Sequence, residues 1–169
     1  SFQMITCTKS YRDIPLSHRQ PLHAGRCSRL HGHSWAITLT FESQELDENG
    51  FVIDFGDLHF IKDWIDQNLD HATALRDNDP HRAECEKMES LGLLKIFWVD
   101  SASCEGIAHF LYYIFQPMID QKTKFGDFFD KDEIILYKNI DYLAEKIQLY
   151  SADDKIRKKM AKKGRDKYF

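Results

Sequence analysis

The chain has 169 residues, 43% of them hydrophobic and 13% aromatic, and its formal net charge at pH 7 is −4. That length and apolar content are typical of a single folded domain and exclude an intrinsically disordered chain. No apolar run approaches the ~20 residues of a membrane-spanning helix and no secretory hydrophobic segment opens the sequence, so we expect a cytoplasmic protein that does not enter the membrane.

Two strands and a turn are predicted in the first third of the sequence. Residues 2–9 mix Thr with aliphatic side chains and predict a strand, whereas residues 10–30 contain Gly and Pro and predict an irregular loop. Apolar and polar residues alternate over residues 33–43, which is typical of a half-buried strand. Asn-Gly at the tip of the turn over residues 46–50 predicts a hairpin, with residues 51–54 as the returning strand.

Helices dominate the remainder of the chain. Residues 56–69 place Leu and Ile at helical spacing, and Asp70-His71 follow at the predicted C-terminal end. Ser103 is in position to cap a helix over residues 104–119, which Pro117 could shorten. The other predicted elements are a loop over 76–81, a polar helix over 82–90, a strand over 94–99 and a strand over 133–138. Strands and helices in this order predict an α+β domain.

The charge is distributed unevenly along the chain. Residues 151–169 contain eight Lys/Arg and three Asp, a net charge of +5, so the remainder is acidic. We predict a domain over residues 1–150 followed by a basic helical tail over residues 151–169. Because the body is acidic, the pattern does not favour nucleic-acid binding, and a solvated helix docked on that body is the preferred interpretation of the tail.

The richest chemistry lies in the segment Cys27–His33, just before the alternating strand. Residues i and i+2 of an extended chain point to the same side, so His31 and His33 can present two imidazoles together. Convergent neutral imidazoles are ligands that zinc takes readily, and a catalytic zinc needs a third protein ligand. His18 and His23 are the nearest candidates for it. The alternative is a pair of exposed loop histidines, which the surrounding Cys and His residues make less favoured.

Four segments, in the same order along the chain, resemble the 6-pyruvoyltetrahydropterin synthase and 6-carboxytetrahydropterin synthase family. The Cys-x-x-x-His-Gly-His run and the Leu-Asp-His motif are specific as a pair, whereas either one by itself would be weak. The segments, within residues 2–140, are Ser17-His18-Arg19 with Cys27–His33, Leu46-Asp47-Glu48-Asn49-Gly50-Phe51-Val52-Ile53-Asp54-Phe55, Leu69-Asp70-His71 and, more loosely, Ser103-Cys104-Glu105-Gly106-Ile107-Ala108.

This resemblance implies a tunnelling fold (T-fold). In that fold an antiparallel four-stranded sheet carries two long helices on one face, and copies of the chain assemble into an oligomeric barrel. The expected homo-oligomer is a hexamer, built as a dimer of trimers. Neighbouring copies would then close the sheet edges, which otherwise invite aggregation.

The resemblance also implies a zinc-dependent lyase. His18, His31 and His33 would hold the metal, which would act as a Lewis acid on the substrate; whether the native metal is zinc or iron stays open. The substrate would be 7,8-dihydroneopterin triphosphate. The product would be 6-carboxytetrahydropterin, on the route to queuosine, or the 6-pyruvoyl compound of tetrahydrobiopterin synthesis.

Proton transfer would fall to Cys27 and to the Asp70-His71 couple, which meet across a subunit boundary in the family. A thiolate is favoured by nearby cations, and an imidazole oriented by a carboxylate titrates near neutrality. Taken without the resemblance, Cys27 could be a small core residue and Asp70-His71 an ordinary helix end. Glu105, in the first turn of a predicted helix, would lie near the pterin.

Lys138 departs from the family pattern. The family carries there a Glu that grips the hydrogen-bond donors of the pterin, and a lysine ammonium has only donors. The Pro-Thr and Asn of the family's helix start are replaced by Ala102-Ser103 and Gly106. Either another acid, Glu105 or Glu145, takes over, or the same fold and zinc site bind a different heterocycle. A non-catalytic, zinc-stabilised oligomer that serves as a binding protein is the third interpretation.

Overall fold

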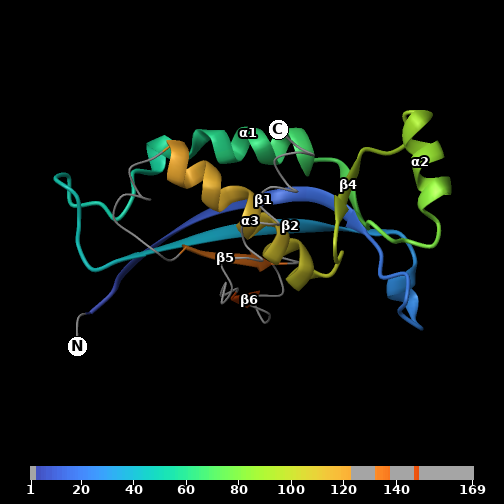
Figure 1. The fold of residues 1–169 in the computed structure, drawn as a ribbon, viewed down its shortest axis with the longest axis horizontal. Coiled ribbons are helices and arrows are strands. Elements are labelled where there is room, and N and C mark those ends of the chain that lie inside the picture. The colour runs from blue at the N-terminus through green and yellow to red at the C-terminus, as the bar shows by residue number, and fades with distance from the viewer. Residues whose placement is uncertain (1–2, 123–131, 138–146, 149–169) are drawn as a thin grey trace.

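A computed structural model describes residues 3–122, 132–137 and 147–148 of the chain. Within these residues six strands form one sheet, in the spatial order β4-β3-β1-β2-β5-β6 (Figure 1). In chain order the elements are β1 (Ile5–His18), η1 (Arg26–Ser28), β2 (His31–Ser43), η2 (Phe55–Leu58), α1 (His59–Asn68), β3 (Ala72–Arg76), α2 (Arg82–Ser90), β4 (Ile96–Val99), α3 (Cys104–Lys122), β5 (Asp132–Tyr137) and β6 (Ile147–Gln148).

The sheet is built on a long hairpin of β1 and β2. The two strands pair antiparallel, from Ile5 opposite Ser43 to His18 opposite His31. Burying a large apolar side chain contributes about 1.5–3 kcal/mol, which makes the apolar face of β2 the main anchor of the sheet. Four large side chains on that face are each 1% exposed: Trp35, Ile37, Leu39 and Phe41.

Both long helices, α1 and α3, cover the same face of the sheet (Figure 1). Trp64 of α1 meets Phe115 of α3 edge-on with 5.1 Å between ring centroids, and Phe97 of β4 with 5.7 Å. Edge-to-face pairs of this kind add about 0.5–1.5 kcal/mol to the burial of the rings. The prediction of two long helices on one face is confirmed, with Pro117 inside α3 rather than at its end.

The α+β class is confirmed, and the sheet is mixed rather than antiparallel throughout. β1, β2, β5 and β6 supply the four antiparallel strands, whereas β3 and β4 extend the sheet beyond β1 in parallel. The sequence does not predict β3, because four of its five residues are buried. A strand covered on both faces shows none of the alternation by which a half-buried strand is found.

Residues 10–18, expected in a loop, continue β1. The register shifts between Tyr11 and Ile14, and Asp13 between them has a φ of 57°. A bulge of this kind inserts an extra residue and breaks the alternation of side chains between the two faces. That break, followed by Pro15, explains why the second half of β1 does not read as a strand.

The predicted hairpin at Asn49-Gly50 is wrong in its second half. The turn forms, with Gly50 at a φ of 79° and the Gly50 N–H donating to the Asp47 carbonyl at 3.0 Å. Residues 51–54, however, do not return as a strand. Both edges of β2 are already paired, one with β1 and the other with β5, so no edge is left for them.

A smaller core lies under α2, at the β3–β4 edge of the sheet. Its residues are Leu75, Cys85, Ile96 and Trp98. The Arg82 guanidinium covers the Trp98 ring at 4.1 Å. The fully buried Asp79 carboxylate accepts the His81 backbone N–H at 2.9 Å and lies 3.0 Å from Nε of Arg19. This ion pair ties the α2 region to the residue that follows His18.

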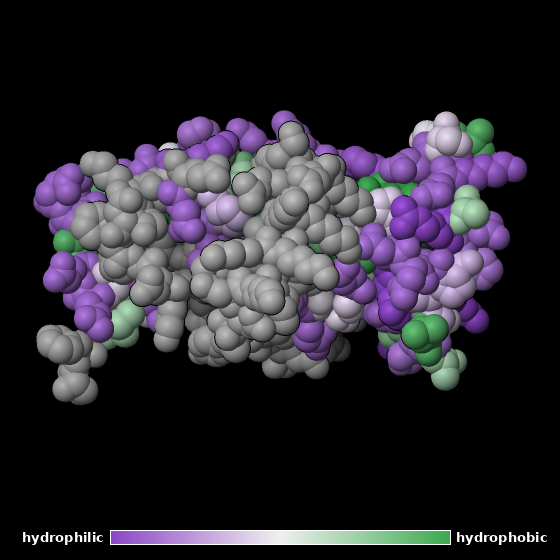
Figure 2. Space-filling view, in the orientation of Figure 1, coloured by the Kyte–Doolittle hydropathy of each residue, from purple (hydrophilic) through white to green (hydrophobic). Residues whose placement is uncertain are grey.

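The described surface is mostly hydrophilic on the face shown in Figure 2. Its most exposed large apolar side chains are 64–76% exposed: Leu22, Leu91 and Leu93. Single apolar residues of this kind are ordinary on protein surfaces. Among the described residues, no helix combines the length and the apolar character that crossing a bilayer requires.

Replacing Arg19 by Met should lower the free energy of unfolding by about 3 kcal/mol, because the Asp79 carboxylate would stay buried without its partner. Urea denaturation of the two proteins measures the difference. The matched control is Lys62→Met, which breaks the exposed Lys62–Asp66 pair on α1 and should cost less than about 0.5 kcal/mol. Equal losses in the two variants would show that the Asp79 pair is not buried in solution.

Candidate metal centre

The β1–β2 register brings three histidines to one end of the hairpin. His18 lies directly opposite His31, and Leu16 lies opposite His33. Side chains directly opposite in an antiparallel pair have Cβ atoms about 4.5–5.5 Å apart. The alternation that buries Trp35 carries on to His33 and His31, so all three imidazoles project from the core face of the hairpin.

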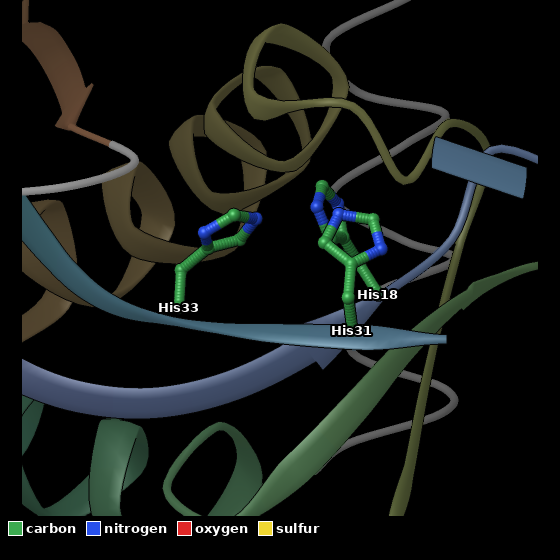
Figure 3. A group of neighbouring side chains, drawn as sticks. All are labelled: His18, His31 and His33. Atoms are coloured by element: carbon green, nitrogen blue, oxygen red, sulfur yellow. The ribbon is translucent and has the colours of Figure 1, made fainter. Parts of the chain in front are cut away.

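The three rings converge on a common point (Figure 3). Ring centroids lie 4.5 Å apart for His18 and His31, 5.0 Å for His31 and His33, and 5.2 Å for His18 and His33. One ligand nitrogen from each residue lies within 4.8 Å of the other two. His18 is buried, the other two are half-buried, and the Trp35 ring stands edge-on beside His18 at 5.1 Å.

Backbone carbonyls fix the tautomers of two of these rings. Nδ1 of His18 lies 2.7 Å from the Ala102 carbonyl oxygen, and Nδ1 of His31 lies 2.7 Å from the Arg29 carbonyl oxygen. A carbonyl oxygen can only accept, so each Nδ1 carries the proton and donates it. In a neutral imidazole the lone pair is then on Nε2, which is the form that binds a metal.

The donor set fits a zinc ion. Three neutral imidazoles from the protein, with further coordination positions left to solvent or substrate, are the ligand set of one kind of catalytic zinc site. In the part of the chain that the structure describes, this is the one group of three or more His, Cys, Asp or Glu side chains with such convergence. His23 does not join it: this exposed residue accepts the Gly25 N–H on Nδ1 at 2.9 Å, within its own loop.

Cys27 lies in η1, in the loop that connects the two histidine-bearing strands. It is half-buried, and its carbonyl accepts the Gln20 N–H at 2.8 Å. The turn around it is closed by the Ser28 hydroxyl, which donates to the Gly25 carbonyl at 2.8 Å.

A second cysteine, Cys7 of β1, is a poorer candidate for a reactive group. Burial raises the pKa of the Cys7 thiol, which keeps it in the unreactive protonated form.

Asp70 and His71 form a couple just past the end of α1. The Asp70 carboxylate contacts Nδ1 of His71, whose own backbone adopts a left-handed φ of 56°. The His71 N–H donates to the Pro15 carbonyl of β1 at 2.8 Å, which fixes the couple beside a histidine-bearing strand. The His71 side chain is nevertheless 84% exposed, so within one chain the couple faces solvent rather than the histidine cluster.

Glu105 is an exposed residue in the first turn of α3. Ser103 caps that turn, as the sequence predicts, since its hydroxyl accepts the Gly106 N–H at 3.0 Å. Lys138 lies outside the described residues, as does the predicted boundary at residue 150.

Sequence reasoning misses three parts of the site. The carbonyls of Arg29 and Ala102 cannot be found from residue type, because every residue has one. Trp35 could be found, because it stands two residues after His33 in the same alternating strand and must therefore share its face.

Family models match two parts of the chain. A model described as 6-pyruvoyl tetrahydropterin synthase matches residues 6–126, and one described as glycosyl transferase-like matches residues 115–169. The first match includes the histidine cluster, Cys27, the Asp70-His71 couple and Glu105. Lys138 lies beyond its end, within the second match.

Curated relatives align with most of the chain. A 6-carboxy-5,6,7,8-tetrahydropterin synthase of Rickettsia bellii is 32% identical over 124 residues, which are 72% of this chain and 88% of the relative. The protein of the same name from Rickettsia typhi is 34% identical over 122 residues, which are 70% of this chain and 86% of that one.

Solved structures share the fold at lower identity. An uncharacterized protein from Wolinella succinogenes superposes with a TM-score of 0.67 at 19% identity, covering 88% of this chain and 99% of that one. The 6-pyruvoyl tetrahydropterin synthase of Plasmodium vivax gives 0.58 at 17% identity, covering 87% and 97%. The predicted tunnelling fold is confirmed by these neighbours.

Replacing His18 by Ala should weaken zinc binding by more than about 100-fold, since losing even an outer partner of a ligand costs 10- to 100-fold. Competition with a chromogenic chelator measures the affinity. The matched control is His23→Ala, which removes a histidine of the same segment that lies outside the cluster and should leave the affinity unchanged. The opposite ranking of the two variants would show that His23 is the third ligand.

Proposed function

The chain belongs to the 6-pyruvoyl tetrahydropterin synthase family, and from that premise we propose that it is a zinc-dependent lyase acting on 7,8-dihydroneopterin triphosphate. The proposed product is 6-carboxytetrahydropterin, as the names of the Rickettsia relatives indicate. We place its synthesis in the cytoplasm, on the route to queuosine. The observation that carries the proposal is the cluster of His18, His31 and His33, two of whose rings are held in the tautomer that binds a metal.

The three histidines would hold the zinc through ring nitrogens. When bound, zinc supplies a Lewis acid that polarises side-chain oxygens of the substrate and acidifies the adjacent C–H. The histidines would thereby also fix the position of the substrate side chain. Trp35, edge-on to His18 and to His33, would limit the rotation of both rings and so keep the ligand atoms in place.

Cys27 would remove the proton that initiates side-chain cleavage. Its loop also carries Arg26 and Arg29, both exposed. A short 3₁₀ turn closed by Ser28 holds the cysteine, so the base would stand on an ordered segment between the two strands that bear the ligands.

Asp70 and His71 would handle the second proton. Asp70 orients the His71 ring through Nδ1, which leaves Nε2 to exchange a proton with the substrate. A proton-transfer group works best where bulk water is excluded, yet this ring is 84% exposed in the single chain. The couple would therefore act on a site completed by another copy of the chain.

A homo-oligomer, a hexamer built as a dimer of trimers, would supply that completion. The pairing of β3 with β1 covers only Leu16–His18, so among the described residues the first half of β1 has no second strand beside it. An open edge of this length is usually protected in native proteins, and a strand from a neighbouring copy would protect it. Light scattering at micromolar concentration should therefore detect no monomer.

One residue favours a second candidate function. Lys138 stands where, by the resemblance, the family carries a Glu that accepts hydrogen bonds from the pterin. A lysine can only donate, so it would suit a different heterocycle bound by the same metal site. In that case Lys138→Glu should create pterin binding that the wild type lacks, and an unchanged affinity would count against it. A non-catalytic, zinc-stabilised binding protein is the remaining alternative, and it predicts that Cys27→Ala changes no measurable function.

The zinc-loaded protein should convert 7,8-dihydroneopterin triphosphate to a product identified by mass spectrometry. Cys27→Ala should lower the rate by about 10²- to 10⁴-fold, the usual contribution of a positioned base, while it keeps the bound zinc. Metal content of both proteins is the control. Metal binding without turnover in the wild type would leave the two alternative functions.

Mixing two impaired variants tests the shared site. Cys27→Ala and His71→Ala should each be slower than the wild type by about 10²- to 10⁴-fold, because each lacks one proton-transfer group. Unfolded together and refolded as mixed oligomers, they should recover activity, since some sites then pair an intact Cys27 with an intact Asp70-His71 couple from different copies. No recovery, with mixed oligomers demonstrated by mass spectrometry, would place both groups in one chain's site.

A further inference from the structure

At the start of α3, Ser101 lies unusually close to Gly106. A Cβ atom added there would lie 2.4 Å from Cβ, 2.5 Å from the carbonyl oxygen and 2.5 Å from Oγ of Ser101. Real Cβ atoms do not come that close to a heavy atom to which they are not bonded. A backbone carbonyl also cannot rotate away as a side chain can. Any residue other than Gly at 106 would therefore displace the segment at Ser101.

The segment 101–103 is held against the start of α3 by two further interactions. Ser103 caps the first turn, and Ala102 and Ile107 occupy the positions of a hydrophobic staple, N′ and N4, with both side chains 0% exposed. A staple fixes the angle at which the chain meets the helix. With the cap and the staple in place, the segment can lie against the first turn only if Gly106 leaves room for Ser101.

The segment 101–103 also contacts the histidine cluster. The Ala102 carbonyl accepts the Nδ1 proton of His18 at 2.7 Å, across 84 residues of sequence. Ala102 is the residue next to Ser101, so a shift forced at Ser101 moves this carbonyl as well. His18 is 2% exposed, so bulk water has little access to replace a displaced acceptor.

We propose that Gly106 is a positioning residue for the metal centre: its missing Cβ lets the segment 101–103 lie on α3, and the Ala102 carbonyl then holds His18 with Nε2 toward the other two histidines. The inference rests on the proposed function for the identity of the metal. It goes beyond that function in assigning a role to a residue outside the histidine cluster.

The first experiment measures zinc affinity by competition with a chromogenic chelator. Gly106→Ala should weaken binding by about 10- to 100-fold, the loss usual when the outer partner of a ligating histidine is disturbed. Gly92→Ala is the matched control, because Gly92 follows α2 with a φ of 74° and no atom within 4 Å, so Ala there strains the backbone far along the chain from His18. The control should bind zinc as the wild type does.

The second experiment reads the His18 ring directly, in metal-free protein. Long-range ¹H–¹⁵N correlation spectra distinguish the two neutral tautomers of imidazole. Wild type and Gly92→Ala should show the proton on Nδ1 of His18, and Gly106→Ala should lose that preference. This measurement tests the positioning role of Gly106 even if the wild type binds no zinc. The absence of zinc binding would overturn the proposed function but not the positioning role.

If Gly106→Ala does not fold, an ester variant replaces it. Incorporating the α-hydroxy acid of serine at position 103 turns the Ala102–Ser103 amide into an ester, whose carbonyl is a weaker acceptor, and leaves every side chain in place. Zinc affinity should then fall several-fold. Wild-type zinc affinity and an unchanged His18 tautomer in folded Gly106→Ala, or wild-type affinity in the ester variant, would overturn the proposal.

Discussion

The antiparallel register of β1 and β2 is the constraint on which the rest of this structure depends. It pairs His18 with His31 and sets both on the face that buries Trp35. A slip of one residue would turn every side chain of a strand to the opposite face and separate the imidazoles. The large apolar residues of β2 oppose that slip, because it would expose them to water. The same burial that folds the sheet therefore assembles the histidine cluster.

Two backbone carbonyls, one close in sequence to its histidine and one distant, orient two of the rings that the register brings together. Arg29 supplies one from the loop before β2, and Ala102 supplies the other from the start of α3. The chain around Ala102 is itself packed closely, because any side chain at position 106 would collide with Ser101, the residue before Ala102. The start of α3 and the orientation of His18 are therefore joined through two neighbouring residues.

The proposed proton-transfer couple is arranged differently from the clustered histidines. The three histidines lie at the end of the core, whereas His71 is held in a left-handed conformation on the surface, its backbone N–H hydrogen-bonded to the Pro15 carbonyl. A left-handed conformation of a residue other than Gly persists where the surrounding structure holds it in place. Nearby, the buried Arg19–Asp79 pair fastens the α2 region beside His18.

The sequence by itself determined the elements whose signals are local. The period of β2, the helical spacing of α1, the polar helix α2 and the Ser103 cap could all be read from neighbouring residues, and the short His-Gly-His run indicated a shared face for two imidazoles. Only the tertiary structure decided the bulge in β1, the parallel strand β3 and the failure of residues 51–54 to pair. The bulged half of β1 and the doubly covered β3 lack the alternation by which a strand is recognised, and residues 51–54 find both edges of β2 already occupied. It also decided between His18 and His23, since a third imidazole is selected by register across two strands and not by distance along one chain.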